Sequence, residues 1–180
     1  EEAPLQAWIA KTGLTADELY PLPKFSQTLA AHGVEQYVFL PHSFLPSLYN
    51  ESMNAGAKVI PRFTLSHGLQ MLAELVKATP GRATFSFYIA EIDSLAHQLG
   101  PNAPGVDAEV DMLFTTLERQ LYQALRGRED TLILFTADHG QVTTNPEYIF
   151  LDRLLPQLEP MIRPGPDGRP QDRQLACRGR

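Results

Sequence analysis

The sequence has one cysteine, no long apolar run and no excess of positive charge. Cys177 has no second cysteine to pair with, so an internal disulfide is excluded and the redox compartment stays open. No apolar stretch reaches the ~18 residues of a membrane-spanning helix. The net charge of −6 argues against nucleic-acid binding, which usually depends on a basic patch or stripe.

The length and composition suit one globular domain followed by a less ordered tail. With 180 residues, 43% of them hydrophobic, the chain can bury a core of ordinary size. We predict an α/β domain over residues 1–159. Residues 160–180 contain four prolines, three glycines and five arginines, a composition typical of a loosely ordered segment.

The N-terminus has neither an initiator methionine nor a signal-peptide pattern. We therefore expect the chain to be the central part of a longer protein. That protein can carry a signal or an anchor elsewhere, so no compartment is predicted.

Predicted strands and helices alternate along the chain, which favours a mostly parallel sheet flanked by helices. Apolar spacing and breaker residues are the evidence for each element. The predicted strands are residues 36–40, 57–60, 85–92 and 131–135, and the predicted helices are residues 23–31, 44–53, 64–78 and 106–126.

Two apolar runs are each followed by an aspartate with a histidine close behind: Asp93 with His97, and Asp138 with His139. The long helix between the two runs is the crossover that parallel strands need, so both aspartates should leave the sheet at its carboxyl edge, where ligands collect. Carboxylate oxygen and imidazole nitrogen both bind Zn²⁺ at about 2.0–2.2 Å. Mixed ligands of this kind suit Zn²⁺ or Mn²⁺ better than Ca²⁺. The sequence predicts a site for one or two divalent metals.

Each pair also has a purely structural interpretation. Asp93 can cap a helix, and Asp138-His139-Gly140 can be an ordinary turn. Adjacent residues point to opposite faces of a regular strand, so Asp138 and His139 converge only if the chain bends, which Gly140 allows. Ser43 is a weaker candidate for a nucleophile, because nothing nearby in sequence would activate it.

The two motifs together resemble the type I phosphodiesterase/nucleotide pyrophosphatase family of the alkaline phosphatase superfamily. The resemblance covers residues 20–142 and is specific over residues 85–141. It implies a partial alkaline-phosphatase-like α/β/α fold. The segments that carry it are Asp93-Ser94-Leu95-Ala96-His97-Gln98-Leu99-Gly100-Pro101, similar to the family's D-x-x-G-H-x-x-G-P, and Thr136-Ala137-Asp138-His139-Gly140, similar to its T/S-D-H-G.

The resemblance implies a two-zinc site that performs in-line phosphoryl transfer on small phosphate esters or nucleotides. Asp93 and His97 would hold one ion together with a downstream histidine. Asp138 and His139 would hold the other, with an aspartate and a Thr or Ser nucleophile from upstream.

This chain departs from the family pattern in three places. Ala96 replaces a glycine, no histidine follows His139, and no nucleophile segment precedes Tyr20. The isolated chain is therefore expected to supply four metal ligands, to bind metal weakly and to be nearly inactive.

Two other functions stay open. One is a phosphomonoesterase, phosphonate hydrolase, sulfatase or phosphomutase of the same superfamily, which would keep the Asp/His frame. The other is a non-catalytic α/β domain that binds a ligand or a partner. The substrate, the choice between Zn²⁺ and Mn²⁺ and the oligomeric state are not predicted.

Overall fold

A computed structural model describes residues 13–21 and 23–143. These residues form a sheet of three parallel strands in the order β2-β1-β3: β1 is Glu35–Pro41, β2 is Lys58–Arg62 and β3 is Ala83–Phe87. In the register, Phe39 of β1 pairs with Ile60 on one side and with Phe87 on the other. The predicted parallel sheet flanked by helices is confirmed.

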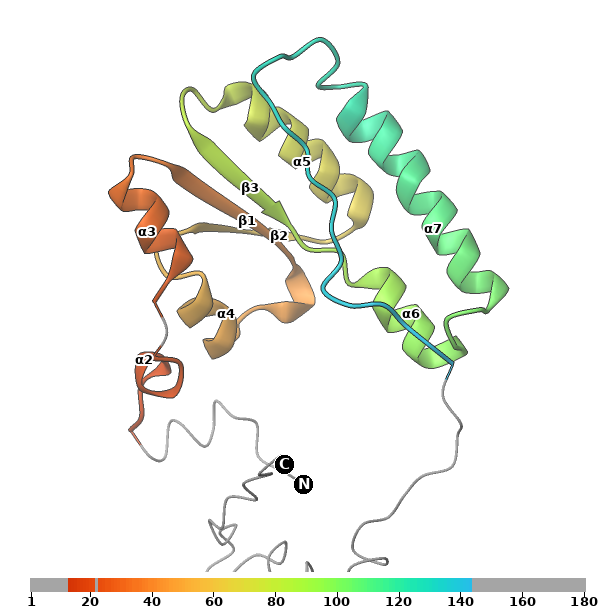
Figure 1. The fold of residues 1–180 in the computed structure, drawn as a ribbon, viewed down its shortest axis with the longest axis horizontal. Coiled ribbons are helices and arrows are strands. Elements are labelled where there is room, and N and C mark those ends of the chain that lie inside the picture. The colour runs from red at the N-terminus through yellow and green to blue at the C-terminus, as the bar shows by residue number, and fades with distance from the viewer. Residues whose placement is uncertain (1–12, 22, 144–180) are drawn as a thin grey trace, which may run out of the picture. The chain divides into compact units, whose positions relative to one another are not determined.

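Helices cover both faces of the sheet (Figure 1). Helices α3 (Phe25–Ala31) and α4 (Leu48–Met53) lie on one side, and α5 (Leu65–Ala78) and α7 (Pro104–Leu117) on the other. The remaining elements are α2 (Ala16–Leu19), the 3-10 turn η1 (His42–Phe44), α6 (Glu91–Leu99) and the π-helical turn η2 (Glu118–Tyr122). None of the helices among the described residues is long and apolar enough to cross a membrane.

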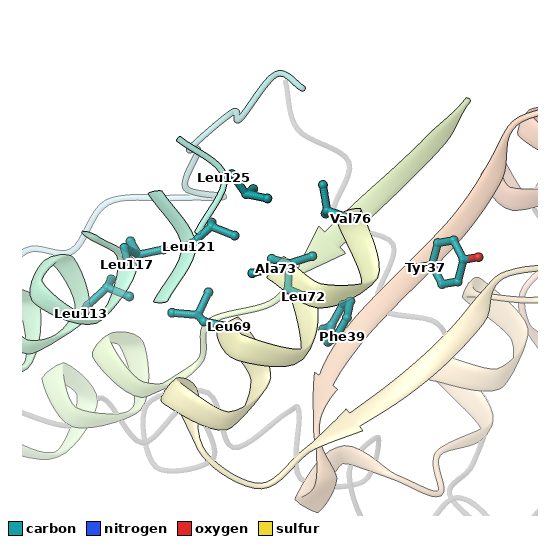
Figure 2. Packing of buried hydrophobic residues seen from close by; sticks show 10 residues of the cluster. All are labelled: Tyr37, Phe39, Leu69, Leu72, Ala73, Val76, Leu113, Leu117, Leu121 and Leu125. Atoms are coloured by element: carbon teal, nitrogen blue, oxygen red, sulfur yellow. The ribbon is translucent and has the colours of Figure 1, made fainter. Parts of the chain in front are cut away.

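The core lies between the sheet, α5 and the row of leucines that begins on α7. Phe39 is fully buried, and its ring stacks on that of Phe87 with the ring centroids 5.7 Å apart. Such cross-strand aromatic pairs stabilise a sheet through both contact area and ring geometry. Figure 2 shows the leucine row facing α5. The buried cluster consists of Tyr37, Phe39, Leu69, Leu72, Ala73, Val76, Leu113, Leu117, Leu121 and Leu125.

The predicted strand over residues 85–92 is wrong in its second half. Its last sheet hydrogen bond runs from the Tyr88 N–H to the Phe39 carbonyl over 3.1 Å. The chain then turns into α6, where the Glu91 carboxylate accepts from the Ala90 N–H over 3.0 Å. Asp93 consequently lies in the first turn of a helix and not at a strand end. The apolar run misled the prediction because a short run of this kind suits a strand or a buried helix equally well.

The predicted strand over residues 131–135 is also wrong. In the part of the chain that the structure describes, residues 131–143 contain no strand. Leu132 and Leu134 are 81% and 80% exposed. The segment and β3 line the same pocket and make no ladder of backbone hydrogen bonds. Strand propensity needs a paired neighbour to be realised. The predicted boundary at residue 159 and the tail over residues 160–180 lie outside the described residues.

Candidate metal centre

Asp93 and His97 lie on the same face of α6, one helical turn apart. The Asp93 Oδ1 and His97 Nε2 atoms are separated by 3.4 Å, and both side chains are accessible to solvent. Residues four apart on a helix are neighbours on its surface. Two ligands held tetrahedrally at about 2.1 Å from one Zn²⁺ lie about 3.4 Å apart. The pair is therefore spaced as two donors to one ion would be.

Asp138 and His139 converge although they are adjacent in sequence. The His139 Nε2 atom lies 3.7 Å from Asp138 Oδ1, and the His139 backbone N–H donates to the same oxygen over 3.1 Å. The bend that this pair required is present. The His139 Nδ1 atom is 3.1 Å from the Gly140 carbonyl. With the proton on Nδ1 donating to this carbonyl, Nε2 keeps the lone pair that a metal needs.

The two motifs meet at one oxygen atom of Asp93. His139 Nε2 lies 3.9 Å from Asp93 Oδ1, and the Gln141 amide donates to that oxygen over 2.6 Å. A second hydrogen bond, from Asn102 Nδ2 to Thr143 Oγ1 over 3.2 Å, joins residues that follow the two motifs in sequence. Asp93 and His139 approach each other, but from a helix and an extended segment rather than from the two strand ends that the sequence predicted.

Sequence reasoning missed Gln141 and the anchor of α6. The only available signal for Gln141 was a long amide side chain next to the Asp-His-Gly motif. The anchor is Arg62, at the end of β2, which binds Glu91 at the start of α6. No local pattern indicates that contact, since the two residues are 29 positions apart.

The electrostatics of α6 depend on the Arg62–Glu91 contact. Burial opposes ionisation of Glu91. Hydrogen bonds from the Arg62 guanidinium and from the Glu91 and Ala90 backbone N–H groups outweigh it, so the pKa of this carboxyl lies below its ordinary value. Glu91 is therefore an anion at neutral pH, at the helix terminus that favours negative charge.

Ser43, the weaker candidate for a nucleophile, and two further histidines form no hydrogen bond or ion pair with the four predicted ligands in the part of the chain that the structure describes. His32 follows α3, with its Nδ1 atom 2.8 Å from the Thr28 carbonyl near the end of that helix. The His42 ring stacks on Phe63 with the ring centroids 4.8 Å apart. Ser43 is exposed in η1.

The donor set fits a divalent metal chemically, because it combines two carboxylates with two imidazoles. Within residues 13–21 and 23–143, no group of three or more His, Cys, Asp or Glu side chains is arranged to hold one ion. The four residues Asp93, His97, Asp138 and His139 thus form two carboxylate–imidazole pairs and remain predicted ligands.

Comparison with protein-family models identifies the family of the chain. The family model described as "Type I phosphodiesterase / nucleotide pyrophosphatase" matches residues 4–176 and so includes both motifs. No curated protein and no solved structure matches the chain.

Proposed function

The chain belongs to the type I phosphodiesterase/nucleotide pyrophosphatase family, and we propose that it supplies four ligands to a two-metal hydrolytic centre. The ligands are Asp93, His97, Asp138 and His139. The proposed reaction is hydrolysis of phosphodiester or nucleotide pyrophosphate bonds in small phosphate esters or nucleotides. The ions are two Zn²⁺, with Mn²⁺ as the alternative. The observation that carries the proposal is the approach of His139 to Asp93, which brings the two motifs together.

Each of the two carboxylate–imidazole pairs would bind one of the two metal ions. Asp93 and His97 would hold one ion, because they share a face of α6 at 3.4 Å. Asp138 and His139 would hold the other. When bound, a metal pair stabilises the attacking and leaving oxygens of an in-line displacement. The protein's contribution is to place the Gly140 carbonyl 3.1 Å from His139 Nδ1, which leaves Nε2 as the metal-facing nitrogen, and to hold Asp93 through Gln141.

The remaining parts of the centre are not assigned to residues of this chain. No histidine follows His139 in the sequence. Among the described residues, the hydrogen bonds of Asp93, Asp138 and His139 involve no Ser or Thr side chain. We propose that the nucleophile and the other ligands come from another part of the protein. The other hydrolases of the superfamily would share the Asp/His frame, so the nucleophile is the feature that separates them from a phosphodiesterase.

Metal binding by the 180-residue chain tests the ligand assignment directly. Zn²⁺ is titrated by calorimetry into the wild type and into Asp93→Asn, His97→Ala and His139→Ala. We expect weak binding by the wild type and a loss of at least about tenfold in each variant. His42→Ala and His67→Ala remove exposed histidines outside the proposed centre and should leave binding unchanged.

Failure of this test has a clear form. A folded wild-type chain, shown by circular dichroism, that takes up no Zn²⁺ would favour a non-catalytic domain. Equal losses in the ligand variants and the controls would reject Asp93, His97 and His139 as ligands.

Measuring turnover tests the proposal that this chain lacks the nucleophile. A chromogenic diester such as bis(p-nitrophenyl) phosphate should be hydrolysed by the Zn²⁺-loaded chain at close to the background rate. Hydrolysis at enzyme-like rates that depends on Zn²⁺ would show that the nucleophile is among these residues.

A further inference from the structure

We propose that Arg62 is a positioning residue for the metal centre: by binding Glu91, it fixes the first turn of α6 and so sets where Asp93 and His97 lie. The inference rests on the proposed function and adds a residue from another strand to it. β2 and β3 flank β1 on opposite sides. Arg62 at the end of β2 therefore spans the carboxyl edge of the sheet to reach the helix that follows β3.

The contact has the geometry of a strong ion pair. Arg62 Nη1 lies 2.6 Å from Glu91 Oε1, and Nη2 lies 2.9 Å from Oε2. Nη2 also donates to the Tyr88 carbonyl over 3.0 Å. Two parallel bonds between a guanidinium and a carboxylate fix both distance and orientation. A lysine, with one ammonium, cannot reproduce that fork.

The Arg62 guanidinium is confined by the residues packed around it. Arg62 is 2% exposed, and its guanidinium carbon lies 5.1 Å from the centre of the Phe87 ring. Gly68 of α5 makes room for the side chain, because a Cβ atom there would come within 2.6 Å of Arg62 Cδ. The Nε atom is buried without a hydrogen-bond partner in the described residues. The contacts with Glu91 and Tyr88 therefore hold the guanidinium.

The Arg62–Glu91 ion pair affects the positions of Asp93 and His97 because all three α6 residues belong to one rigid helix. Asp93 lies two residues beyond Glu91, or about 3 Å along the axis at about 1.5 Å per residue. A buried arginine without its partner is costly, so Glu91 has to stay opposite Arg62. Metal–ligand distances tolerate only about 0.2 Å of error. A small shift of the first turn of α6 is thus enough to spoil the Asp93–His97 pair.

Cobalt binding separates a positioning role from a merely structural one. Co²⁺ is titrated into the wild type and Arg62→Lys, and the visible absorption of the bound ion reports the geometry of its ligands. We expect Arg62→Lys to weaken Co²⁺ binding about tenfold, as loss of residues that orient metal ligands does, and to change the band positions and intensities.

Two control variants separate the loss of the Arg62–Glu91 contact from a general loss of stability. Val76→Ala weakens the core on α5 away from the ion pair, and Lys58→Met removes the exposed ion pair of β2 with Glu35. Both should leave Co²⁺ affinity and the spectrum unchanged, even where thermal stability falls as far as in Arg62→Lys. The same affinity and spectrum in Arg62→Lys and Val76→Ala would overturn the proposal.

A second variant covers the case in which Arg62→Lys does not fold. Glu91→Gln keeps the shape of the side chain and loses its charge, and it should produce the same spectral change. The double variant should bind Co²⁺ no more weakly than either single variant, because both remove one interaction; multiplied losses would contradict this. A folded wild type without any Co²⁺ binding would reject the metal centre itself and this inference with it.

Discussion

Gln141 donates a hydrogen bond of 2.6 Å to Asp93 Oδ1, joining two residues that are 48 positions apart. The same oxygen faces the imidazoles of His97 at 3.4 Å and His139 at 3.9 Å. Asp93 is therefore the point at which both motifs meet. The extended segment that carries Asp138 and His139 has no strand partner among the described residues, so this hydrogen bond is one of the few contacts that tie it to α6.

Replacing Gln141 should loosen that segment selectively. Gln141→Ala removes the hydrogen bond to Asp93. A hydrogen bond to a charged group contributes no more than about 3 kcal/mol to stability. We expect lower ¹⁵N order parameters for residues 138–143 and unchanged values in α6. Gln70→Ala is the matched control, since Gln70 also donates to a carboxylate, that of Glu74 on α5. Unchanged order parameters in Gln141→Ala would show that other contacts hold the segment.

The sheet and its helices were accessible to sequence reasoning because their signals are local. Thr64 caps α5 by accepting from the His67 N–H over 3.2 Å, as the capping rule predicts. The central strand β1 is a continuous buried apolar run of the kind found in parallel sheets. The leucine row of residues 113–125 follows the four-residue spacing of one helix face.

The elements that carry the candidate site were harder to predict because their state depends on distant partners. Whether residues 89–92 continue a strand or begin a helix depends on Arg62 from another strand, which holds Glu91 and the Tyr88 carbonyl. Whether residues 131–135 form a strand depends on a partner edge, which no local pattern reports. The four candidate ligands could be named from spacing alone, whereas Gln141 and Arg62 required the tertiary contacts.

Gly68→Ala should destabilise the fold although alanine is the better helix former. The added Cβ would lie 2.6 Å from Arg62 Cδ and 2.9 Å from two atoms of the Phe87 ring. Overpacking of this kind costs about 1–3 kcal/mol, against a gain of about 1 kcal/mol in helix propensity. Urea unfolding followed by circular dichroism measures the difference.

Gly105→Ala is the control for that substitution. Its Cβ meets only Leu99 Cδ1 at 3.1 Å, the end of an exposed side chain that can move. We expect stability equal to or above that of the wild type. A Gly68→Ala chain as stable as Gly105→Ala would mean that Arg62 is not packed against α5 as described.

The exposed pair of Glu35 and Lys58 should respond to pH in a defined direction. Hydrogen bonds from Lys58 and from the Tyr37 hydroxyl, together with the charge of Lys58, hold the pKa of Glu35 below its ordinary value. The pair therefore stabilises the fold above the ordinary glutamate pKa of about 4.3. That contribution is lost as the pH falls through the lowered pKa of the folded state.

Carbon-detected NMR titration of the side-chain carboxyls measures the pKa of Glu35 and tests whether Lys58 lowers it. Lys58→Met should raise the pKa of Glu35 toward its ordinary value. The pKa of Glu18 is lowered by hydrogen bonds from Thr15 and should not change. A Glu35 titration that is the same with and without Lys58 would contradict the assigned cause.

Two leucine substitutions distinguish the observed position of residues 131–135 from the buried strand that the sequence pattern predicts. Leu117 is 4% exposed within the core, and Leu134 is 80% exposed. Leu117→Ala should cost about 2–5 kcal/mol, because it removes contacts and leaves a cavity. Leu134→Ala should change the free energy of unfolding by no more than about 0.5 kcal/mol, as is usual for a surface substitution. Urea unfolding of both variants gives the comparison directly. A loss in Leu134→Ala as large as that in Leu117→Ala would mean that the segment is buried in solution, with Asp138 and His139 leaving the sheet at a strand end after all.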